Sequence, residues 1–174
     1  KPGSELASQI HEQGSKIVAD EANRVGASVL GMSTDYVFDG SLNRPYVEGD
    51  PPNPLNVYGV TKWKGELALQ SANRWGIVRS AWFFGPNRPN FVRTILKLMD
   101  EKGDVEVVDD QVGSPTYTRD LAGALATLIE GRAEGLYHVT NAGEASWFDL
   151  AREAARVTGR NQERIRPAKT SQVP

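Results

Sequence analysis

A tyrosine stands four residues before a lysine in the segment NPLNVYGVTK, residues 53–62. In a helix this spacing places Tyr58 and Lys62 on the same face. A phenol titrates near pH ~10 and a lysine ammonium near ~10.4 when unperturbed, so a tyrosine that transfers a proton at neutral pH needs a cation beside it. The pair is therefore a candidate acid–base site. The same spacing also arises by chance on a solvated helix face, so its surroundings must decide between the two interpretations.

The residues before the pair indicate a loop that leads into a helix. Pro51, Pro52 and Pro54 are incompatible with the interior of a regular helix, and Asn56 is a suitable N-cap for the helix that follows. Tyr58 is then expected in the first helical turn, beside a cleft.

Hydrophobic periodicity and glycine positions predict an alternation of helices and strands along the chain. Besides the helix that carries Tyr58, helices are expected over residues 4–24, 90–102 and 118–129 and between 147 and 159, and strands over 27–32, 76–82, 105–108 and 135–140. Ser146 and Asp149 are expected to form a capping box. The final residues, 161–174, are polar and are predicted to form a loop.

This alternation is typical of an α/β fold with a parallel sheet covered on both faces. Such sheets bind ligands at the carboxyl ends of their strands. Thr34 follows the strand at 27–32, and Trp82 ends the strand at 76–82. We therefore expect Thr34, Tyr58 and Trp82 to converge on one cleft.

Composition excludes several other classes of protein. The chain has 174 residues, 39% of them apolar and 24% charged, which is ordinary for a globular protein, and a net charge of −2 makes nucleic acid or an anionic membrane an unexpected partner. It has no cysteine, which excludes disulfides and zinc–thiolate sites, and His11 and His138 lack the spacing of a metal site, so no metal is expected. Without a signal peptide or a membrane-length apolar run, the default location is the cytoplasm.

Four segments in order resemble the dTDP-4-dehydrorhamnose reductase family of the extended short-chain dehydrogenase/reductase superfamily. They are STDYVFDG (33–40), PYVEGDPPNPLNVYGVTKWKGE (45–66), DDQVGSPTYTRDLA (109–122) and GLYHVTNAGEASWFDLA (135–151). The resemblance implies an NAD(P)-binding, Rossmann-like, doubly wound parallel sheet with a small C-terminal substrate-binding region. It also implies that residues 1–174 form a single partial domain. Residues 1–82 would be the later part of the Rossmann core, and residues 83–174 would be mixed core and substrate-binding segments.

The resemblance also implies roles for individual residues. Thr34, Tyr58 and Lys62 match the family's catalytic triad, in which a hydride passes from NADPH or NADH to a sugar ketone while the tyrosine supplies a proton and the threonine holds the same oxygen. Tyr58 and Lys62 would also bind the cofactor, with Lys62 on the nicotinamide ribose. Thr34 and a further set of residues match positions that bind the nucleotide-sugar substrate: Asp35, Trp82, Asn90, Phe91, Gln111, Thr116 and Tyr117. Trp82 is also compatible with a simple core position.

The family's glycine-rich turn for the cofactor pyrophosphate is missing, because neither G-x-x-G-x-x-G nor G-x-G-x-x-G occurs in the chain. The chain is therefore expected to be the later part of a reductase, without the N-terminal strands and without the residue that separates NAD from NADP. We expect it to bind nicotinamide cofactors weakly by itself. An exposed strand edge would make it aggregate or pair with another chain, as in a homodimer.

Three classes of function remain open. The first is a nucleotide-sugar ketoreductase that reduces dTDP-4-dehydro-L-rhamnose to dTDP-L-rhamnose in deoxysugar synthesis for a cell-surface polysaccharide. The second is a regulatory module, because the beta subunit of methionine adenosyltransferase resembles the same family; the segment DDQVGSPTY favours the reductase. The third is an epimerase or dehydratase of the superfamily, and STDYVFDG, in place of the SSxxVYG form, argues against it.

Overall fold

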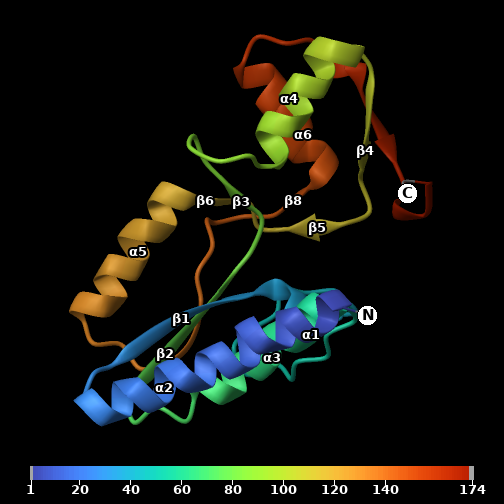
Figure 1. The fold of residues 1–174 in the computed structure, drawn as a ribbon. Helices are drawn as coiled ribbons and strands as arrows, with labels where there is room; N and C mark the ends of the chain where they lie inside the picture. The colour runs from blue at the N-terminus through green and yellow to red at the C-terminus, as the bar shows by residue number, and fades with distance from the viewer. Residues whose placement is uncertain (1, 173–174) are drawn as a thin grey trace. The chain divides into compact units, whose positions relative to one another are not determined.

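The protein is described by a computed structural model that covers residues 2–172 (Figure 1). The helices are α1 (Pro2–Ser8), a π-helical turn (Gln9–Gln13), α2 (Gly14–Val25), α3 (Val57–Leu69), α4 (Phe91–Lys102), α5 (Thr118–Glu130) and α6 (Trp147–Val157). The strands are β1 (Val29–Thr34), β2 (Trp75–Ser80), β3 (Phe83–Phe84), β4 (Val105–Val108), β5 (Val112–Gly113), β6 (Thr116–Tyr117), β7 (Gly135–His138), β8 (Ala145–Ser146) and β9 (Ile165–Ala168). Short 3₁₀ turns cover Asp35–Val37, Gln162–Arg164 and Thr170–Gln172.

The chain forms two compact units that alternate along the sequence. The first unit consists of residues 1–80 and 123–139, and the second of residues 81–122 and 140–174. None of the helices in the part of the chain that the structure describes has the length and apolar character needed to cross a membrane.

The first unit contains a three-stranded parallel sheet in the order β1-β2-β7. In its register Thr34 lies opposite Ser80, and Arg79 lies opposite His138. Parallel strands need crossover connections, and the helices between them provide these. The observed order confirms the expected α/β class with parallel strands. Two expected boundaries were wrong by about two residues: β1 extends to Thr34, and β2 ends at Ser80, which leaves Trp82 outside it.

Helices α2 and α3 pack against each other and on β1 (Figure 1). Gly26 ends α2 with a φ of 68°, a left-handed conformation that glycine adopts at low cost. Asn56 caps α3, because its Oδ1 accepts a hydrogen bond of 2.8 Å from the backbone N–H of Gly59. Both helix boundaries confirm the prediction from sequence. These elements bring the first turn of α3 beside the end of β1.

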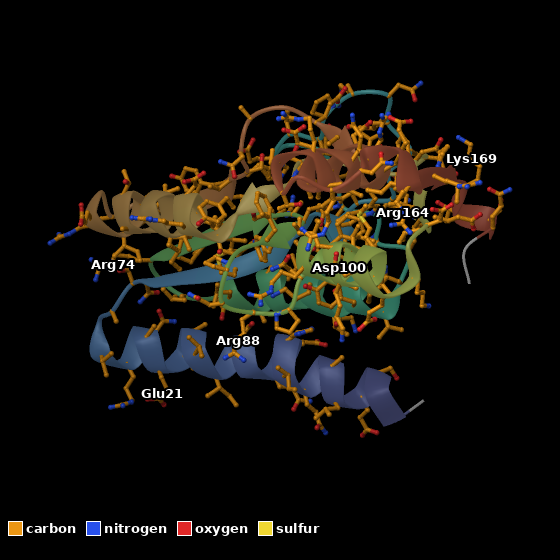
Figure 2. All side chains as sticks on the ribbon, turned by 90° about the horizontal axis from the view of Figure 1, so that it is seen from above. Glu21, Arg74, Arg88, Asp100, Arg164 and Lys169 are labelled. Atoms are coloured by element: carbon orange, nitrogen blue, oxygen red, sulfur yellow. The ribbon has the colours of Figure 1, made fainter. Side chains whose placement is uncertain are left out.

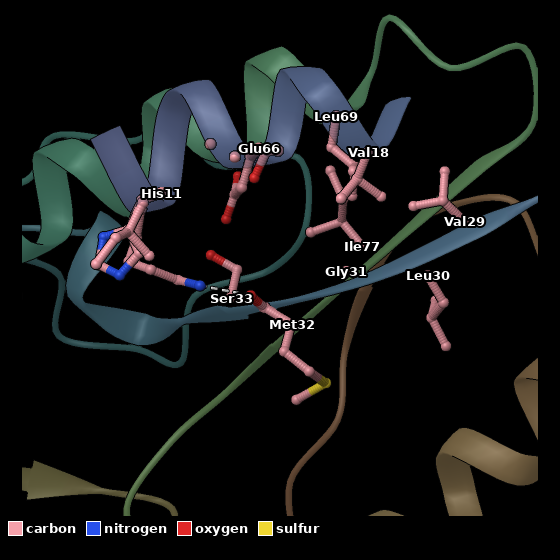
Figure 3. A pocket seen from close by; sticks show the side chains of 15 residues that line it. His11, Val18, Val29, Leu30, Gly31, Met32, Ser33, Glu66, Leu69 and Ile77 are labelled. Atoms are coloured by element: carbon pink, nitrogen blue, oxygen red, sulfur yellow. Dashed lines mark hydrogen bonds between the residues drawn. The ribbon is translucent and has the colours of Figure 1, made fainter. Parts of the chain in front are cut away.

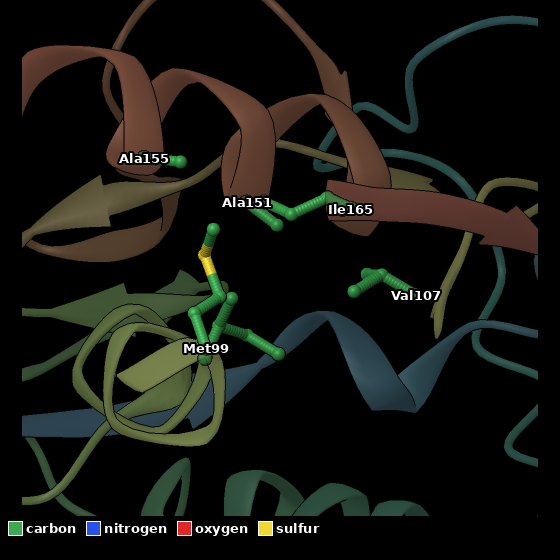
Figure 4. Close-up of a cluster of buried hydrophobic side chains, with 6 residues drawn as sticks. Met99, Val107, Ala151, Ala155 and Ile165 are labelled. Atoms are coloured by element: carbon green, nitrogen blue, oxygen red, sulfur yellow. The ribbon is translucent and has the colours of Figure 1, made fainter. Parts of the chain in front are cut away.

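The second unit is built around a small apolar core between α4, α6, β4 and β9 (Figure 4). Ala151 and Ala155 of α6 are fully buried and face Met99 of α4. The predicted capping box begins α6: the Ser146 hydroxyl accepts from the Asp149 N–H at 3.0 Å, and the Asp149 carboxylate accepts from the Ser146 N–H at 3.0 Å. Short side chains on α6 allow the two helices to approach closely.

The prediction of a loop over residues 161–174 was wrong for its central part. Residues 165–168 form β9, which pairs in parallel with β4, while Val173 and Pro174 lie outside the described residues. Ion pairs flank this pairing, among them Arg160 with Asp100 at 2.7 Å and Lys169 with Asp109 at 2.8 Å. Figure 2 labels Asp100 and Lys169. The strand forms because partners about sixty positions earlier in the chain accept it.

Candidate active site

Thr34 is the last residue of β1, and its side chain is held by the turn that follows. Its hydroxyl donates a hydrogen bond of 3.0 Å to Oδ1 of Asp35 and accepts one of 3.2 Å from the Tyr36 N–H. Thr34 is buried, with 6% of its surface exposed. Burial also raises the pKa of the Asp35 carboxyl, and hydrogen bonds from Thr34 and from the local backbone oppose this effect. The hydroxyl proton of Thr34 is thus directed to Asp35.

Tyr58 lies in the first turn of α3, and a glycine lets that turn approach the end of β1. A Cβ atom at Gly59 would lie 2.1 Å from the carbonyl oxygen of Tyr36, which no side chain could tolerate without movement of the backbone. The rings of Tyr36 and Tyr58 meet edge to face, with centroids 5.8 Å apart. The sequence Tyr-Gly therefore places the phenol next to Thr34 and Asp35.

Burial raises the pKa of the Tyr58 phenol, and a hydrogen bond with Thr34 partly opposes the rise. The negative charge of Asp35 raises the pKa further. The expectation that Lys62 lowers the pKa of Tyr58 is therefore not met in this structure. The higher pKa makes the phenol a weaker acid than a free tyrosine.

Lys62 lies one turn after Tyr58 on α3, and its Nζ donates a hydrogen bond of 2.6 Å to the carbonyl oxygen of Met32 in β1. Burial lowers the pKa of the Lys62 ammonium, and the nearby Glu66 carboxylate opposes this effect. Met32 uses one of the three N–H donors of the ammonium. Lys62 therefore has donors left for a ligand.

A cavity of about 380 Å³ adjoins Lys62, between the two packed helices and β1 (Figure 3). His11, Ser33 and Glu66 line it together with apolar side chains. The Ser33 hydroxyl is buried and has no hydrogen-bond partner among the described residues. His11 contacts Tyr58 edge to face at 5.8 Å, and its Nδ1 lies 3.0 Å from the Thr61 hydroxyl. His11, expected to be structural, thus has a structural hydrogen bond and also adjoins the candidate acid.

A buried ion pair behind these residues was missed by the sequence analysis. Nε and Nη2 of Arg79 donate to the two carboxylate oxygens of Glu66 at 2.9 and 2.6 Å, and each residue is 4% exposed. Arg79 also lies over the ring of Phe38, 5.0 Å from its centroid. An arginine inside an otherwise apolar strand was the available signal, because a buried charge requires a partner. The pair fixes α3 to β2.

The second unit brings three of its predicted site residues to one side chain that the sequence analysis had not assigned, Trp147. The indoles of Trp82 and Trp147 are stacked with centroids 3.5 Å apart and planes 6° apart. The ring of Phe91 lies 4.4 Å from that of Trp147, and Trp147 Nε1 donates to Oε1 of Gln111 at 3.3 Å. Trp147 lies within the family-like segment GLYHVTNAGEASWFDLA. The one feature of the sequence that could have drawn attention to it is its place beside the capping-box residue Ser146.

The remaining predicted residues of this unit have structural contacts of their own. Asn90 caps α4 and donates to the Gly85 carbonyl at 2.7 Å. Thr116 is 1% exposed, and its hydroxyl donates to the Ser114 carbonyl at 3.1 Å. Tyr117 packs on Phe84, with ring centroids 5.5 Å apart, and both residues line a cavity of about 530 Å³. The roles of these residues in substrate binding stay predictions.

Comparison with known proteins supports the resemblance. A dTDP-4-dehydrorhamnose reductase of Streptomyces griseus is 44% identical over 93% of this chain and 56% of its own length. A dTDP-4-keto-6-deoxy-D-glucose reductase of Streptomyces niveus is 39% identical over 98% of this chain and 60% of its own length. The crystal structure of dTDP-4-dehydrorhamnose reductase from Bacillus anthracis, in complex with NADP, superposes with a TM-score of 0.92 at 37% identity and covers 98% of this chain and 61% of that one.

These matches confirm the expected Rossmann-like architecture, since the fold of the solved reductase covers nearly all of this chain. The chain itself spans about three-fifths or less of these relatives. The family model described as the RmlD substrate binding domain matches residues 2–174. The chain therefore belongs to the RmlD substrate binding domain family.

Proposed function

We propose that the protein to which this chain belongs reduces the 4-keto group of dTDP-4-dehydro-L-rhamnose to give dTDP-L-rhamnose, with NADPH or NADH as the reductant. One observation carries the proposal: Thr34, Tyr58 and Lys62 lie together at the carboxyl end of β1, with Tyr58 hydrogen-bonded to Thr34 and Lys62 bonded to the carbonyl oxygen of Met32. Relatives named as reductases of this ketosugar support the choice of substrate.

The chemistry assigned to the chain is proton donation and stabilisation of negative charge. As the ketone oxygen gains an electron pair, the Tyr58 phenol donates its proton to it, and the Thr34 hydroxyl donates a hydrogen bond to the same oxygen. Because that hydroxyl now donates to Asp35, it must rotate away from the carboxylate to reach a ketone. Tyr58 is protonated at neutral pH, and its raised pKa makes it a weaker acid, so the donation relies on the developing alkoxide, which is a stronger base than a phenolate.

The residues present fit the ribose end of a nicotinamide cofactor. Lys62 keeps two N–H donors beyond its bond to Met32, and the adjoining cavity holds an unpartnered Ser33 hydroxyl. These donors suit the hydroxyl groups of a ribose. When bound, the cofactor would supply the hydride. Lys62 would hold the ribose hydroxyls and keep a positive charge near the developing alkoxide.

The test is Tyr58→Phe in the full-length protein, assayed by stopped-flow oxidation of NADPH with dTDP-4-dehydro-L-rhamnose. The substitution keeps the ring and removes the hydroxyl, so kcat should fall by between about 100-fold and 10,000-fold while the affinity for cofactor stays close to that of the unmodified protein. Tyr137→Phe is a matched control, because the Tyr137 hydroxyl donates only to the Glu134 carbonyl, at 2.9 Å. Reduction at the unmodified rate by Tyr58→Phe would remove the triad assignment, whereas no reduction by the unmodified full-length protein would favour a regulatory module.

We further propose that residues 1–82 form the later part of the cofactor-binding core and that residues 83–174 combine core segments with substrate-binding residues. Those residues are Asn90, Phe91, Gln111, Thr116 and Tyr117. A homodimer is also proposed, because an unpaired strand edge can pair with another chain. Light scattering of the full-length protein measures its mass directly. The cytoplasmic location and the expected lack of nucleic-acid or membrane partners stay predictions.

A further inference from the structure

Trp82 has a backbone conformation that few residues of its size adopt. Its φ is 49°, in the left-handed region, where a bulky side chain crowds the neighbouring carbonyl. Such a conformation persists only where surrounding contacts determine it, and it occurs preferentially at ligand-binding sites. The contacts of Trp82 therefore show which residues maintain this backbone conformation and the orientation of the indole.

Two neighbours confine the Trp82 indole. Trp147 stacks on one face, with planes 6° apart. Gly113 leaves room for the ring, because a Cβ atom at that position would lie 2.6 Å from Cε2 of Trp82. The indole is thus fixed by a stacking partner and by the absence of a side chain opposite its edge.

Trp147 is itself held firmly. It is the first residue of α6, directly after the N-cap Ser146 and within the capping box that Ser146 forms with Asp149. Its Nε1 donates to Gln111, whose amide group donates in turn to the Thr170 hydroxyl at 3.0 Å. The orientation of the stack is therefore set by a helix end and by a hydrogen-bond chain to the segment after β9.

We propose that Trp147 is a positioning residue for substrate binding, which holds the indole of Trp82 in the orientation that receives the sugar of the nucleotide-sugar substrate. The inference rests on the proposed function and on the pocket role that the family resemblance implies for Trp82. Trp147 acts on the substrate only through Trp82. Gln111 fixes the orientation of the Trp147 indole, and thereby of the stack, through its hydrogen bond with Nε1 of Trp147.

A simpler role for Trp147 is core packing, since it lies against the apolar cluster that contains Met99 and Ala151. Phe148 packs against the same cluster, and its ring lies under the guanidinium of Arg152, 5.5 Å from the ring centroid. Phe148→Leu is therefore a matched control that disturbs the core and leaves the stack in place. Trp147→Leu keeps an apolar side chain in the core and removes the stack.

The experiment compares the full-length protein with Trp147→Leu, Trp147→Phe, Trp82→Leu and Phe148→Leu. Far-ultraviolet circular dichroism measures the paired bands of opposite sign that two coupled indoles produce. Steady-state kinetics give KM and kcat for dTDP-4-dehydro-L-rhamnose, and calorimetry gives the Kd for NADPH. A stacked aromatic pair is held by a free energy equivalent to between about 3-fold and 10-fold in an equilibrium constant. Loss of the held orientation of Trp82 is therefore expected to raise KM by about this factor.

We expect Trp147→Leu to lose the coupled bands and to raise KM by that factor, with kcat and the Kd for NADPH close to those of the unmodified protein. Trp147→Phe should restore part of the lost affinity, because it keeps a ring on the face of Trp82. Combining Trp82→Leu with Trp147→Leu should raise KM no further than Trp82→Leu alone, since both changes remove one interaction.

An unchanged KM in Trp147→Leu, or an equal rise in Phe148→Leu, would overturn the inference and leave the proposed function intact. Coupled bands that persist in Trp147→Leu would show that the stack is not their source and would overturn it too. A full-length protein that turns over no ketosugar would instead refute the proposed function, and the positioning role with it.

Discussion

The buried pair of Glu66 and Arg79 allows a sharp prediction about stability. Each residue is 4% exposed, and two hydrogen bonds of 2.9 and 2.6 Å join them. Glu66→Leu removes the carboxylate and leaves the Arg79 guanidinium buried without a counter-charge. Its Nη1 already has no hydrogen-bond partner within the described part of the chain, so no spare acceptor replaces Glu66.

The expected loss is large compared with the stability of a domain. Removing one partner of a buried ion pair costs about 3–5 kcal/mol, against a total free energy of unfolding of about 5–15 kcal/mol. With a urea dependence of about 2 kcal/mol per molar, the unfolding midpoint should fall by about 2 M. Glu66→Leu combined with Arg79→Met removes both charges and should restore most of this stability, because well-packed apolar side chains can replace a buried pair.

The assay is urea unfolding of the full-length protein, followed by circular dichroism. Glu21→Gln is a matched control, since Glu21 pairs with Arg24 at 2.7 Å on the exposed face of α2, where ion pairs contribute little. A midpoint for Glu66→Leu that equals that of the control, or a double variant no more stable than the single one, would refute the reasoning.

Three further predictions concern the candidate site and its loop. Burial lowers the pKa of Lys62 and raises that of Tyr58, so the alkaline loss of reductase activity should follow deprotonation of Lys62, and Lys62→Arg should move it to higher pH in a pH–rate profile. Gly59→Ala, which brings a Cβ atom against the Tyr36 carbonyl, should lower kcat and the melting temperature together. Hydrogen bonds from the Arg44 guanidinium lower the pKa of Asp50 to about 2. The stability that this ionised carboxylate contributes is fully present above pH ~4 and is lost as the pH falls through about 2. The melting temperature of Asp50→Asn should therefore lack this pH dependence.

Local signals in the sequence predicted the elements well. Asn56 before α3 and the capping box at Ser146 mark helix starts through contacts within three residues, so neighbouring residue types are sufficient to find them. The placement of Tyr58 and Lys62 on one helical face follows from spacing alone. The structure puts Thr34 at the carboxyl end of β1, although the strand extends two residues further than the sequence analysis expected.

The features that sequence reasoning missed depend on partners far along the chain. Residues 165–168 show no clear alternation and contain Pro167, yet they pair with β4 as a strand. The contact of Trp82 with Trp147 joins residues sixty-five positions apart, and the left-handed conformation of Trp82 has no local signal. The raised pKa of Tyr58 depends on burial, which spacing does not reveal.

The interleaving of the two units has a consequence for synthesis on the ribosome. β2 pairs with β7, with Ile77 opposite Leu136, although residues 81–122 of the other unit are made between them. At about 5–20 residues per second, translation leaves the outer edge of β2 unpaired for a few seconds or longer. An unpaired strand edge is a template for pairing with other chains. The nascent protein is therefore expected to be most exposed to aggregation in this interval, and to depend on chaperones until Gly135–His138 emerges.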